Sequence, residues 1–355
     1  MPECLMFKYG LNITTRGQAK PCCIFRTSSK DEQHDLYDID AARAHFETLY
    51  EESLDKWLPQ CINCSKPESR TGDSLRVRSH DIFKEGSGDG IRYLDMEISN
   101  TCNLTCRMCS PHSSSKWGAM VKNNPQLEWT GHDRSAARVK YGWHKDLDSI
   151  KHLLKHLQVL KFTGGEPFLI PQVKQVIDYV CEQGLAPNIS LKIITNGTVD
   201  LTPWFDKLVQ FDMVDLAVSM EATESRFEYM RPGASWEQVS GNCIALQKMI
   251  DEHDAYDVEV RIVPLLSVLN FAHVKTLEKW TKDHGMVWHD PDTEIIEPLH
   301  MTFQALKPEL REKYNIHTTF PYKEETWLQL CKQMEIQDSI HGTDFRTECK
   351  ELFDA

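Results

Sequence analysis

Two patterns of apolar residues alternate along the chain from about residue 91 onward. Short runs rich in Val, Ile and Leu predict strands, and longer stretches with apolar residues three and four positions apart predict amphipathic helices. The expected strands are 91–99, 159–163, 191–195, 213–219 and 258–266, with a sixth between residues 285 and 298. The expected helices are 147–157, one that starts at Pro171 and stops near Gly184, 235–250 and 274–284.

This alternation of strands and helices predicts an α/β fold built on a parallel sheet, either closed or open. In such folds the chemistry gathers at the carboxyl ends of the strands. Four polar or glycine-rich segments directly follow predicted strands, so we expect them at one edge of one sheet. These segments are the cysteine group that begins at Cys102, Gly164-Gly165-Glu166, Thr195-Asn196-Gly197 and Ser219-Met220-Glu221.

Composition narrows the class of protein. The chain has 355 residues, of which 41% are hydrophobic and 26% charged, which is normal for a globular protein and excludes wholesale disorder. The formal net charge of −13 argues against nonspecific binding to nucleic acid or to anionic membrane. No apolar run is long enough to span a bilayer and no secretory signal is visible, so we expect a cytoplasmic protein. Its 12 cysteines then point to metal ligands and core residues rather than to disulfides.

Three cysteines lie close together in a polar loop directly after the first predicted strand of the alternating region. Cys102, Cys106 and Cys109 have the spacing C-x-x-x-C-x-x-C. Structural zinc sites use four ligands, whereas an iron–sulfur cubane held by three thiolates leaves one iron open for another ligand. A zinc site completed by His112 is the alternative, and three core cysteines fit less well because the loop is polar.

At these residues the chain resembles the radical S-adenosylmethionine (SAM) superfamily, over about residues 93–298. The resemblance rests on the cysteine spacing together with Gly-Gly-Glu at the end of the next strand. It implies a partial (β/α)6 barrel in which Cys102, Cys106 and Cys109 hold a [4Fe–4S] cluster whose fourth iron binds SAM. An electron passed into SAM would yield a 5′-deoxyadenosyl radical that removes a hydrogen atom from the substrate. Met108 departs from the family pattern, in which an aromatic residue often precedes the last cysteine.

The same resemblance suggests residues for the SAM-binding edge. The alternative for the glycine segment is a plain strand-to-helix turn, and the alternative for Arg231 is a solvated surface arginine. Glu221 stands where the family more often has Asp, so it is given no role, and Asn270 is a weaker candidate for a nucleoside contact. The expected SAM-contacting residues are Gly164, Gly165, Glu166, Thr195, Asn196, Ser219 and Arg231.

Further cysteines precede the barrel. Cys4, Gly17 and Cys22 are spaced like the opening of a SPASM-type motif, and Cys61 and Cys64 match its later C-x-x-C pair. SPASM and twitch modules bind auxiliary iron–sulfur clusters, and the shortened motif here has ligands for one such cluster. Cys23 could replace Cys22 or be a spare thiol. A zinc knuckle is the main alternative, and counting metals after anaerobic reconstitution separates the two hypotheses.

These interpretations divide the chain into an auxiliary iron–sulfur module (residues 1–88), a radical SAM partial barrel (89–300) and a helical C-terminal tail (301–355). The expected function is radical SAM modification of a peptide or protein, with an external electron donor of the flavodoxin or ferredoxin type. A small-molecule substrate such as a sugar or nucleotide, and a noncatalytic iron–sulfur protein that carries electrons or senses redox state, are the alternatives. Cys181, Cys243 and Cys331 lie on apolar helical stripes and are expected to pack in the core.

Overall fold

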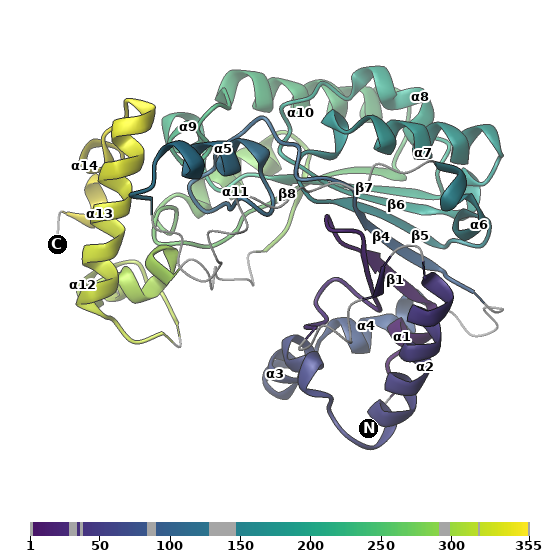
Figure 1. Cartoon of the computed structure of the whole chain (residues 1–355). Helices are drawn as coiled ribbons and strands as arrows, with labels where there is room; N and C mark the ends of the chain where they lie inside the picture. The colour runs from purple at the N-terminus through teal and green to yellow at the C-terminus, as the bar shows by residue number, and fades with distance from the viewer. Residues whose placement is uncertain are drawn as a thin grey trace. The chain divides into compact units, whose positions relative to one another are not determined.

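The computed structural model describes residues 3–27, 34–35, 38–83, 90–127, 147–290, 299–318 and 320–353 (Figure 1). The chain divides into two compact units. The first comprises residues 1–100, 140–193 and 209–214, and the second comprises residues 101–139, 194–208 and 215–355. Most of the loop predicted at residues 84–90 lies outside the described residues, so the division at residue 88 stays a prediction.

The described strands form one mostly parallel sheet with the order β3-β2-β1-β4-β5-β6-β7-β8-β9. Strands β1 to β5 belong to the first unit, β8 and β9 belong to the second, and β6 and β7 have residues in both. This arrangement confirms the predicted α/β class and is consistent with a partial radical SAM barrel. The strands are β1 Gly10–Ile13, β2 Gln18–Lys20, β3 His34–Asp35, β4 Tyr93–Glu97, β5 Val159–Thr163, β6 Ser190–Thr195, β7 Met213–Ser219, β8 Val258–Val263 and β9 Val287–Trp288.

The strand register shows where the N-terminal residues enter the sheet. In the first unit, β1 pairs parallel with β4 and aligns Asn12 with Asp95. The next pair, β4 and β5, is also parallel and aligns Asp95 with Lys161. β1 pairs antiparallel with β2, and β2 pairs antiparallel with β3, so the N-terminal segment adds a hairpin and a further short strand to the sheet. The sequence pattern predicted the strands from β4 onward but not this hairpin.

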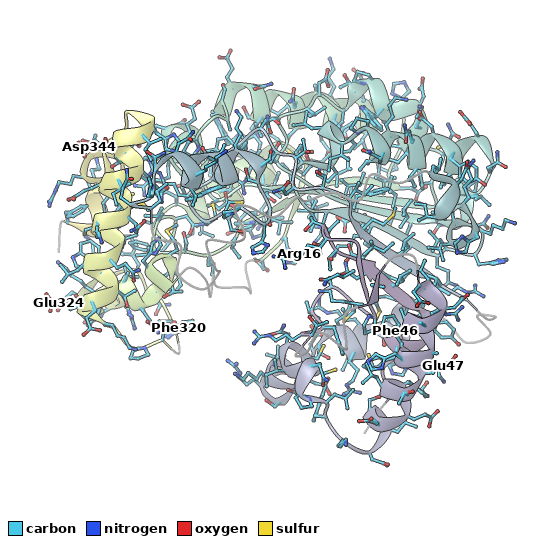
Figure 2. All side chains as sticks on the ribbon, in the orientation of Figure 1. Arg16, Phe46, Glu47, Phe320, Glu324 and Asp344 are labelled. Carbon is cyan, nitrogen blue, oxygen red and sulfur yellow. The ribbon has the colours of Figure 1, made fainter. Side chains whose placement is uncertain are left out.

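Helices of the first unit come from the N-terminal segment and from the connections after β4 and β5. On α2, Phe46 is buried while its neighbour Glu47 is exposed, as expected for a helix with one apolar face (Figure 2). The helices are α1 Met6–Tyr9, α2 Ile39–Asp55, η2 Pro59–Cys61, α3 Ile62–Thr71, α4 Leu75–Ile82, η4 Leu147–Ser149, α6 Lys151–Leu154, η5 Pro167–Leu169, α7 Pro171–Glu182 and η6 Ala186–Asn188.

Helices of the second unit include three long ones, α10, α11 and α13. The described part of the C-terminal segment contains helices and no strand, in agreement with the predicted helical tail. The helices are α5 Ser115–Asn123, η7 Thr202–Trp204, α8 Phe205–Leu208, α9 Glu224–Met230, α10 Trp236–Glu252, α11 Val274–Asp283, η8 Leu299–Met301, η9 Phe303–Ala305, α12 Pro308–Lys313, α13 Glu324–His341, α14 Phe345–Glu348 and η10 Lys350–Leu352.

Helix ends agree with the signals that the sequence carries. Pro171 is the first residue of α7, where its missing N–H costs nothing, and Gly184 follows the end of this helix with φ +65°. Ser235 caps α10 by accepting a hydrogen bond from the Gln238 backbone N–H. Ser235 and Gln238 have the spacing of a capping box, but its second half is not formed, because the Gln238 side chain donates to the carbonyl oxygen of Thr198 instead.

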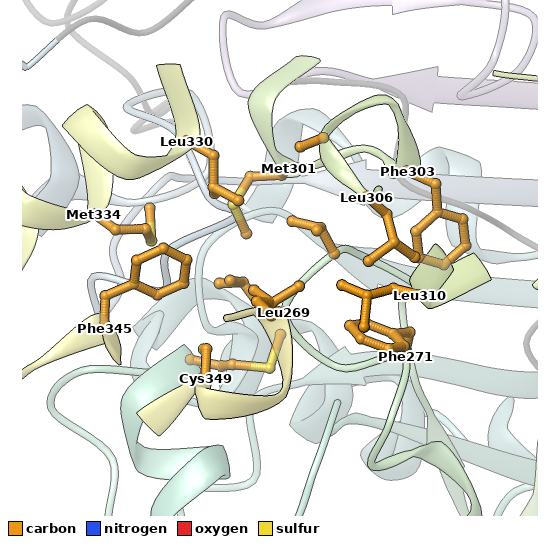
Figure 3. Close-up of a cluster of buried hydrophobic side chains, with 14 of the residues drawn as sticks. Leu269, Phe271, Met301, Phe303, Leu306, Leu310, Leu330, Met334, Phe345 and Cys349 are labelled. Carbon is orange, nitrogen blue, oxygen red and sulfur yellow. The ribbon is translucent and has the colours of Figure 1, made fainter. Parts of the chain in front are cut away.

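A buried apolar cluster joins the C-terminal helices to the rest of the second unit. Leu330 and Met334 of α13 and Phe345 of α14 pack with Leu269 and Phe271 (Figure 3). Cys349, which the sequence left without a role, is fully buried in the same cluster. The C-terminal helices are therefore part of the core of the second unit.

Candidate functional site

The loop that carries the three central cysteines is fastened from two directions within the second unit. On one side, α5 holds it: the Ser114 hydroxyl donates to the carbonyl oxygen of Leu104, and the Trp117 indole N–H donates to that of Cys106, both at 2.7 Å. On the other side, the end of α9 holds it: the N–H groups of Thr105 and Arg107 donate to the carbonyl oxygens of Pro232 and Met230 at 3.1 and 2.9 Å. These bonds set the path of the loop without using the cysteine sulfurs.

The cysteine thiols of this loop lie in a low-dielectric environment. Cys106 is buried, and Cys102 and Cys109 are partly exposed. Burial raises the pKa of Cys106 to about 11, and burial also raises the pKa of Cys109. A coordinated metal supplies the positive charge that keeps such thiols deprotonated, so this donor set fits an iron–sulfur cluster.

A buried arginine faces one of these sulfurs. Arg231 Nη1 lies 3.5 Å from Cys106 Sγ. Its Nε and Nη2 each donate to Glu221 at 2.6 Å, so the guanidinium is held as a bidentate ion pair. Burial lowers the pKa of Arg231, but the negative charge of Glu221 outweighs it and the pKa is raised. Arg231 is only 7% exposed, so it is not the solvated surface arginine that was the alternative.

An asparagine reaches a second sulfur of the loop. Asn196 Nδ2 lies 3.8 Å from Cys102 Sγ and donates to Asn103 Oδ1 at 2.9 Å. Its Oδ1 accepts from the Thr198 hydroxyl, which in turn accepts from Asn103 Nδ2. Thr195 supports this turn by accepting from the N–H of Gly197. Asn103 and Thr198 were not singled out from the sequence, although Asn103 lies in the cysteine group and Thr198 directly follows Thr195-Asn196-Gly197.

The end of β7 is held by a second asparagine. Asn270 Nδ2 donates to the carbonyl oxygens of Glu221 and Leu265, and its Oδ1 accepts from Ser267. Asn270 therefore positions the residue that pairs with Arg231. Ser219, the last residue of β7, is partly exposed.

The predicted glycine segment lies in the first unit, at the end of β5. Gly164 has φ +110°, and a Cβ added there would lie 2.7 Å from the carbonyl oxygen of Ser99. The N–H of Gly165 donates to the same oxygen at 2.9 Å. Glu166 is fully buried and accepts from the N–H of Phe168 at 3.2 Å. Glycine is thus required at position 164, both because of the backbone conformation and because a side chain would collide with Ser99.

Four N-terminal cysteines line one pocket of the first unit. Apolar residues, among them Phe7, Phe25 and Trp57, and the side chain of Arg76 complete the pocket wall. Burial raises the pKa of Cys4 to about 11 and that of Cys61 to about 12, and it also raises the pKa values of the other two thiols. The four cysteines are Cys4, Cys22, Cys61 and Cys64.

Backbone N–H groups partly offset the effect of burial on two of these thiols. Those of Met6 and Phe7 lower the pKa of Cys4. Those of Leu75 and Arg76, at the start of α4, lower the pKa of Cys64. N–H groups near sulfur stabilise thiolates and tune iron–sulfur clusters.

Cys23 contacts different groups. It does not line the pocket; its sulfur lies 3.9 Å from Lys161 Nζ. Lys161 also forms a 2.9 Å ion pair with Asp95, whose side chain is buried. Cys22 and Cys23 are thus adjacent in sequence but lie in different surroundings.

The described residues contain neither a ready-made site for a single metal ion nor a membrane-spanning helix. No three His, Cys, Asp or Glu side chains among them are arranged to hold a single metal ion. None of the described helices combines the length and the apolar character needed to cross a membrane.

Comparison with known proteins relates the central part of the chain to one superfamily. Residues 96–268, just under half of the chain, match the model of the radical SAM superfamily. This segment is therefore similar to radical SAM proteins. Radical SAM proteins bind a [4Fe–4S] cluster and SAM and require an electron donor, and the loop of Cys102, Cys106 and Cys109 lies within the matched segment.

One curated relative and several solved structures are also similar to the chain. It is 25% identical to the "Uncharacterized protein MJ0907" of Methanocaldococcus jannaschii over 225 residues, which cover 63% of this chain and 69% of the relative. The structure entitled "Native anSMEcpe with bound AdoMet and Cp18Cys peptide" is 17% identical with a TM-score of 0.40, and the match covers 71% of this chain and 61% of the other. SuiB of Streptococcus suis, bound to its precursor peptide SuiA, is 12% identical with a TM-score of 0.36, and the match covers 70% of this chain and 51% of SuiB. The chain thus spans less than two thirds of the length of these two proteins.

Proposed function

We propose that the protein is a radical SAM enzyme, that Cys102, Cys106 and Cys109 hold its [4Fe–4S] cluster, that a second cluster lies in the N-terminal pocket, and that the substrate is a peptide or protein. The observation that carries the first part is the arrangement around the loop: Arg231 and Asn196 each direct a nitrogen at a different cysteine sulfur. Donors aimed at sulfur are suited to thiolate ligands.

The residues around the loop have separable roles in this proposal. When bound, the cluster and SAM supply one-electron cleavage of SAM and, with it, removal of a hydrogen atom from the substrate. Arg231 places positive charge beside Cys106, and Glu221 keeps the guanidinium in that orientation. Asn196 fixes the loop through Asn103.

We assign roles to the predicted SAM-contacting residues from the strand ends at which they lie. Gly164, Gly165 and Glu166 form the backbone edge that receives the amino group of SAM. Thr195 and Ser219 lie at the ends of β6 and β7, where nucleoside or carboxylate contacts are expected. The side-chain oxygen of Asn196 accepts from both the N–H and the hydroxyl of Thr198, so we assign this asparagine as a support for the loop more than as a direct SAM ligand.

For the N-terminal pocket we propose an auxiliary iron–sulfur cluster held by Cys4, Cys22, Cys61 and Cys64. Four thiols around one pocket support this assignment, as do backbone N–H groups that lower the pKa of two of them, Cys4 and Cys64. Full ligation by four cysteines favours a role in electron transfer over substrate binding. A zinc knuckle is the second candidate because four cysteines also suit zinc, but no three of the described side chains are arranged to hold a single metal ion.

Metal analysis distinguishes these candidates. After anaerobic reconstitution, we expect about eight irons per chain for two cubanes. Replacing Cys102, Cys106 and Cys109 by Ala is expected to leave about four irons, and replacing the four pocket cysteines is expected to do the same. About four irons with one zinc in the wild-type chain would support the zinc knuckle and contradict the auxiliary cluster.

The substrate proposal rests on the resemblance of the N-terminal module to modules of peptide-modifying radical SAM enzymes. An external donor of the flavodoxin or ferredoxin type supplies the electron. The test is incubation of the reconstituted protein with SAM, reductant and deuterated candidate peptides, in particular a short peptide encoded beside this protein. We expect 5′-deoxyadenosine that carries deuterium from a peptide. Deuterium transfer from a sugar or nucleotide, and from no peptide, would favour the small-molecule alternative.

A further inference from the structure

The residue that follows the second cluster cysteine points away from the sulfurs and into the C-terminal helices. The Arg107 side chain is fully buried. Its Nη2 forms a 2.8 Å ion pair with Asp338 of α13 and donates to the Thr343 hydroxyl at 2.7 Å. Its Nε donates to the carbonyl oxygen of Tyr229 at 2.7 Å, and the guanidinium lies 3.7 Å from the centre of the Tyr229 ring. Arg107 of the cluster loop thus contacts α13, Thr343 in the turn after α13, and α9.

The carboxylate that receives Arg107 is itself held in place. Asp338 Oδ1 accepts from the Thr343 hydroxyl, and Oδ2 accepts from the backbone N–H of Phe345, both at 2.6 Å. These bonds close the turn between α13 and α14. A buried arginine requires a fixed counter-charge, and this turn supplies one.

Apolar contacts connect the same helix to the third cysteine. Cys109 of the loop and Ile336 and Ile340 of α13 all pack against one buried cluster. Met108 packs against the larger cluster that contains Leu330 and Met334 of α13. Consecutive loop residues, from Arg107 to Cys109, therefore border α13 or the cores that it shares. That larger core is the one in Figure 3.

We infer that α13 and the turn after it are part of the SAM-cluster site, and that the Arg107–Asp338 ion pair is a positioning contact for the loop that carries Cys106 and Cys109. The inference rests on the proposed ligand set. Arg107 acts through the backbone of the loop, whose N–H at Arg107 is bound to the carbonyl oxygen of Met230. The C-terminal segment would then stabilise the cluster, although it supplies no ligand to it.

The test compares two isosteric substitutions on the same helix in the full-length chain. Asp338→Asn removes the charge that Arg107 requires. Glu335→Gln changes an exposed carboxylate three residues earlier and serves as the matched control. Hydrogen exchange of residues 102–110 is measured in the metal-free chain, and the rate of iron loss to a chelator and the EPR spectrum of the reduced cluster are measured after reconstitution.

We expect loop exchange and iron loss to be at least about tenfold faster in Asp338→Asn, which corresponds to about 1.4 kcal/mol. The EPR spectrum is expected to change in the same variant and to recover toward the wild-type spectrum in Asp338→Glu. The Glu335→Gln control is expected to match the wild type. If Asp338→Asn does not fold, Thr343→Val, which removes one hydrogen bond to each partner, is expected to show smaller changes in the same direction.

Unchanged loop exchange and an unchanged EPR spectrum in a folded Asp338→Asn or Thr343→Val chain would overturn the inference. Failure of the proposed function has a different signature. In that case the wild-type chain binds no iron at the loop of Cys102, Cys106 and Cys109. Hydrogen exchange in the metal-free chain still shows whether Asp338 positions this loop.

Discussion

Arg231 and Glu221, ten residues apart, form a buried bidentate ion pair that leaves one guanidinium nitrogen for Cys106. Glu221 is 2% exposed and Arg231 is 7% exposed, so neither charge is well solvated. The pair therefore does two things: each residue neutralises the other, and Glu221 aims Nη1 at a proposed cluster ligand. Glu at a position where the family more often has Asp thus has a defined partner in this chain.

Glu221→Gln should strongly destabilise the protein. Leaving a buried Arg231 without its counter-charge costs about 3–5 kcal/mol. Chemical unfolding of the metal-free chain measures this change. The control is Glu252→Gln, which breaks an exposed pair with Lys248 and should change the free energy of unfolding by less than about 1 kcal/mol. Equal losses in the two variants would contradict the role assigned to the buried pair.

Gly164→Ala should weaken both folding and SAM binding. The residue has φ +110°, and the new methyl group would lie 2.7 Å from the carbonyl oxygen of Ser99. Backbone strain of this type costs on the order of 1–3 kcal/mol. Unfolding and the Kd for SAM are both measured. Gly241→Ala, in α10 with no atom within 4 Å of the added Cβ, is the control and should be neutral or stabilising. SAM binding at wild-type affinity in Gly164→Ala would remove this segment from the SAM site.

Cys22 and Cys23 form a matched pair for the auxiliary site. Cys22 lines the pocket with the other three cysteines, whereas Cys23 lies beside Lys161. Cys22→Ser is therefore expected to lower the metal content of the N-terminal pocket, and Cys23→Ser to leave it unchanged. The measurement is iron and zinc content in chains that also lack Cys102, Cys106 and Cys109. The reverse result would assign Cys23 as the ligand.

His300 should make the protein less stable in acid. Its side chain is buried, neither ring nitrogen has a hydrogen-bond partner among the described residues, and burial lowers its pKa to about 4 from an ordinary value of 6.5. The folded state thus favours the neutral ring. The contribution of the neutral ring to the free energy of unfolding is fully present above pH 6.5. It is lost as the pH falls toward 4, and the total loss is about 3 kcal/mol.

Unfolding of the metal-free chain between pH 7 and pH 4.5 measures this effect. His300→Leu should show a smaller loss of stability over this range than the wild type. His273 and His341 also have lowered pKa values because of burial, so the variant retains some pH dependence. Identical pH profiles of the two chains would show that His300 is not the titrating group.

Local patterns predicted much of the fold and the position of the cysteine loop. Strand β8 is an example, because Val258, Val260 and Ile262 alternate with more exposed residues. The start of α7 at Pro171 was equally clear, since proline favours the first turn. Strand β1 was not predicted because it has only four residues, all of them buried, and therefore no alternation. Its place in the sheet depends on pairing with β4, far along the chain.

The contacts around the site could not be predicted in the same way. The sequence indicated Arg231 as a candidate, but its partner Glu221 and its approach to Cys106 depend on how the end of β7 folds back on α9. Arg107 and Asp338 are separated by 231 positions, and no local spacing connects them. The spacing of cysteines in the sequence predicts metal ligands that share one loop. The side chains that contact those ligands are brought there by tertiary packing, which local spacing does not predict.

Reductive cleavage of SAM tests the central claim most directly. The reconstituted protein is incubated anaerobically with SAM and dithionite, and 5′-deoxyadenosine is quantified for the wild type, Cys106→Ala and Cys243→Ala. Cys243 is buried on α10 and is the control for losing a core thiol. We predict 5′-deoxyadenosine from the wild type and from Cys243→Ala, and none above background from Cys106→Ala. An intact cluster that binds no SAM and releases no 5′-deoxyadenosine would contradict the account.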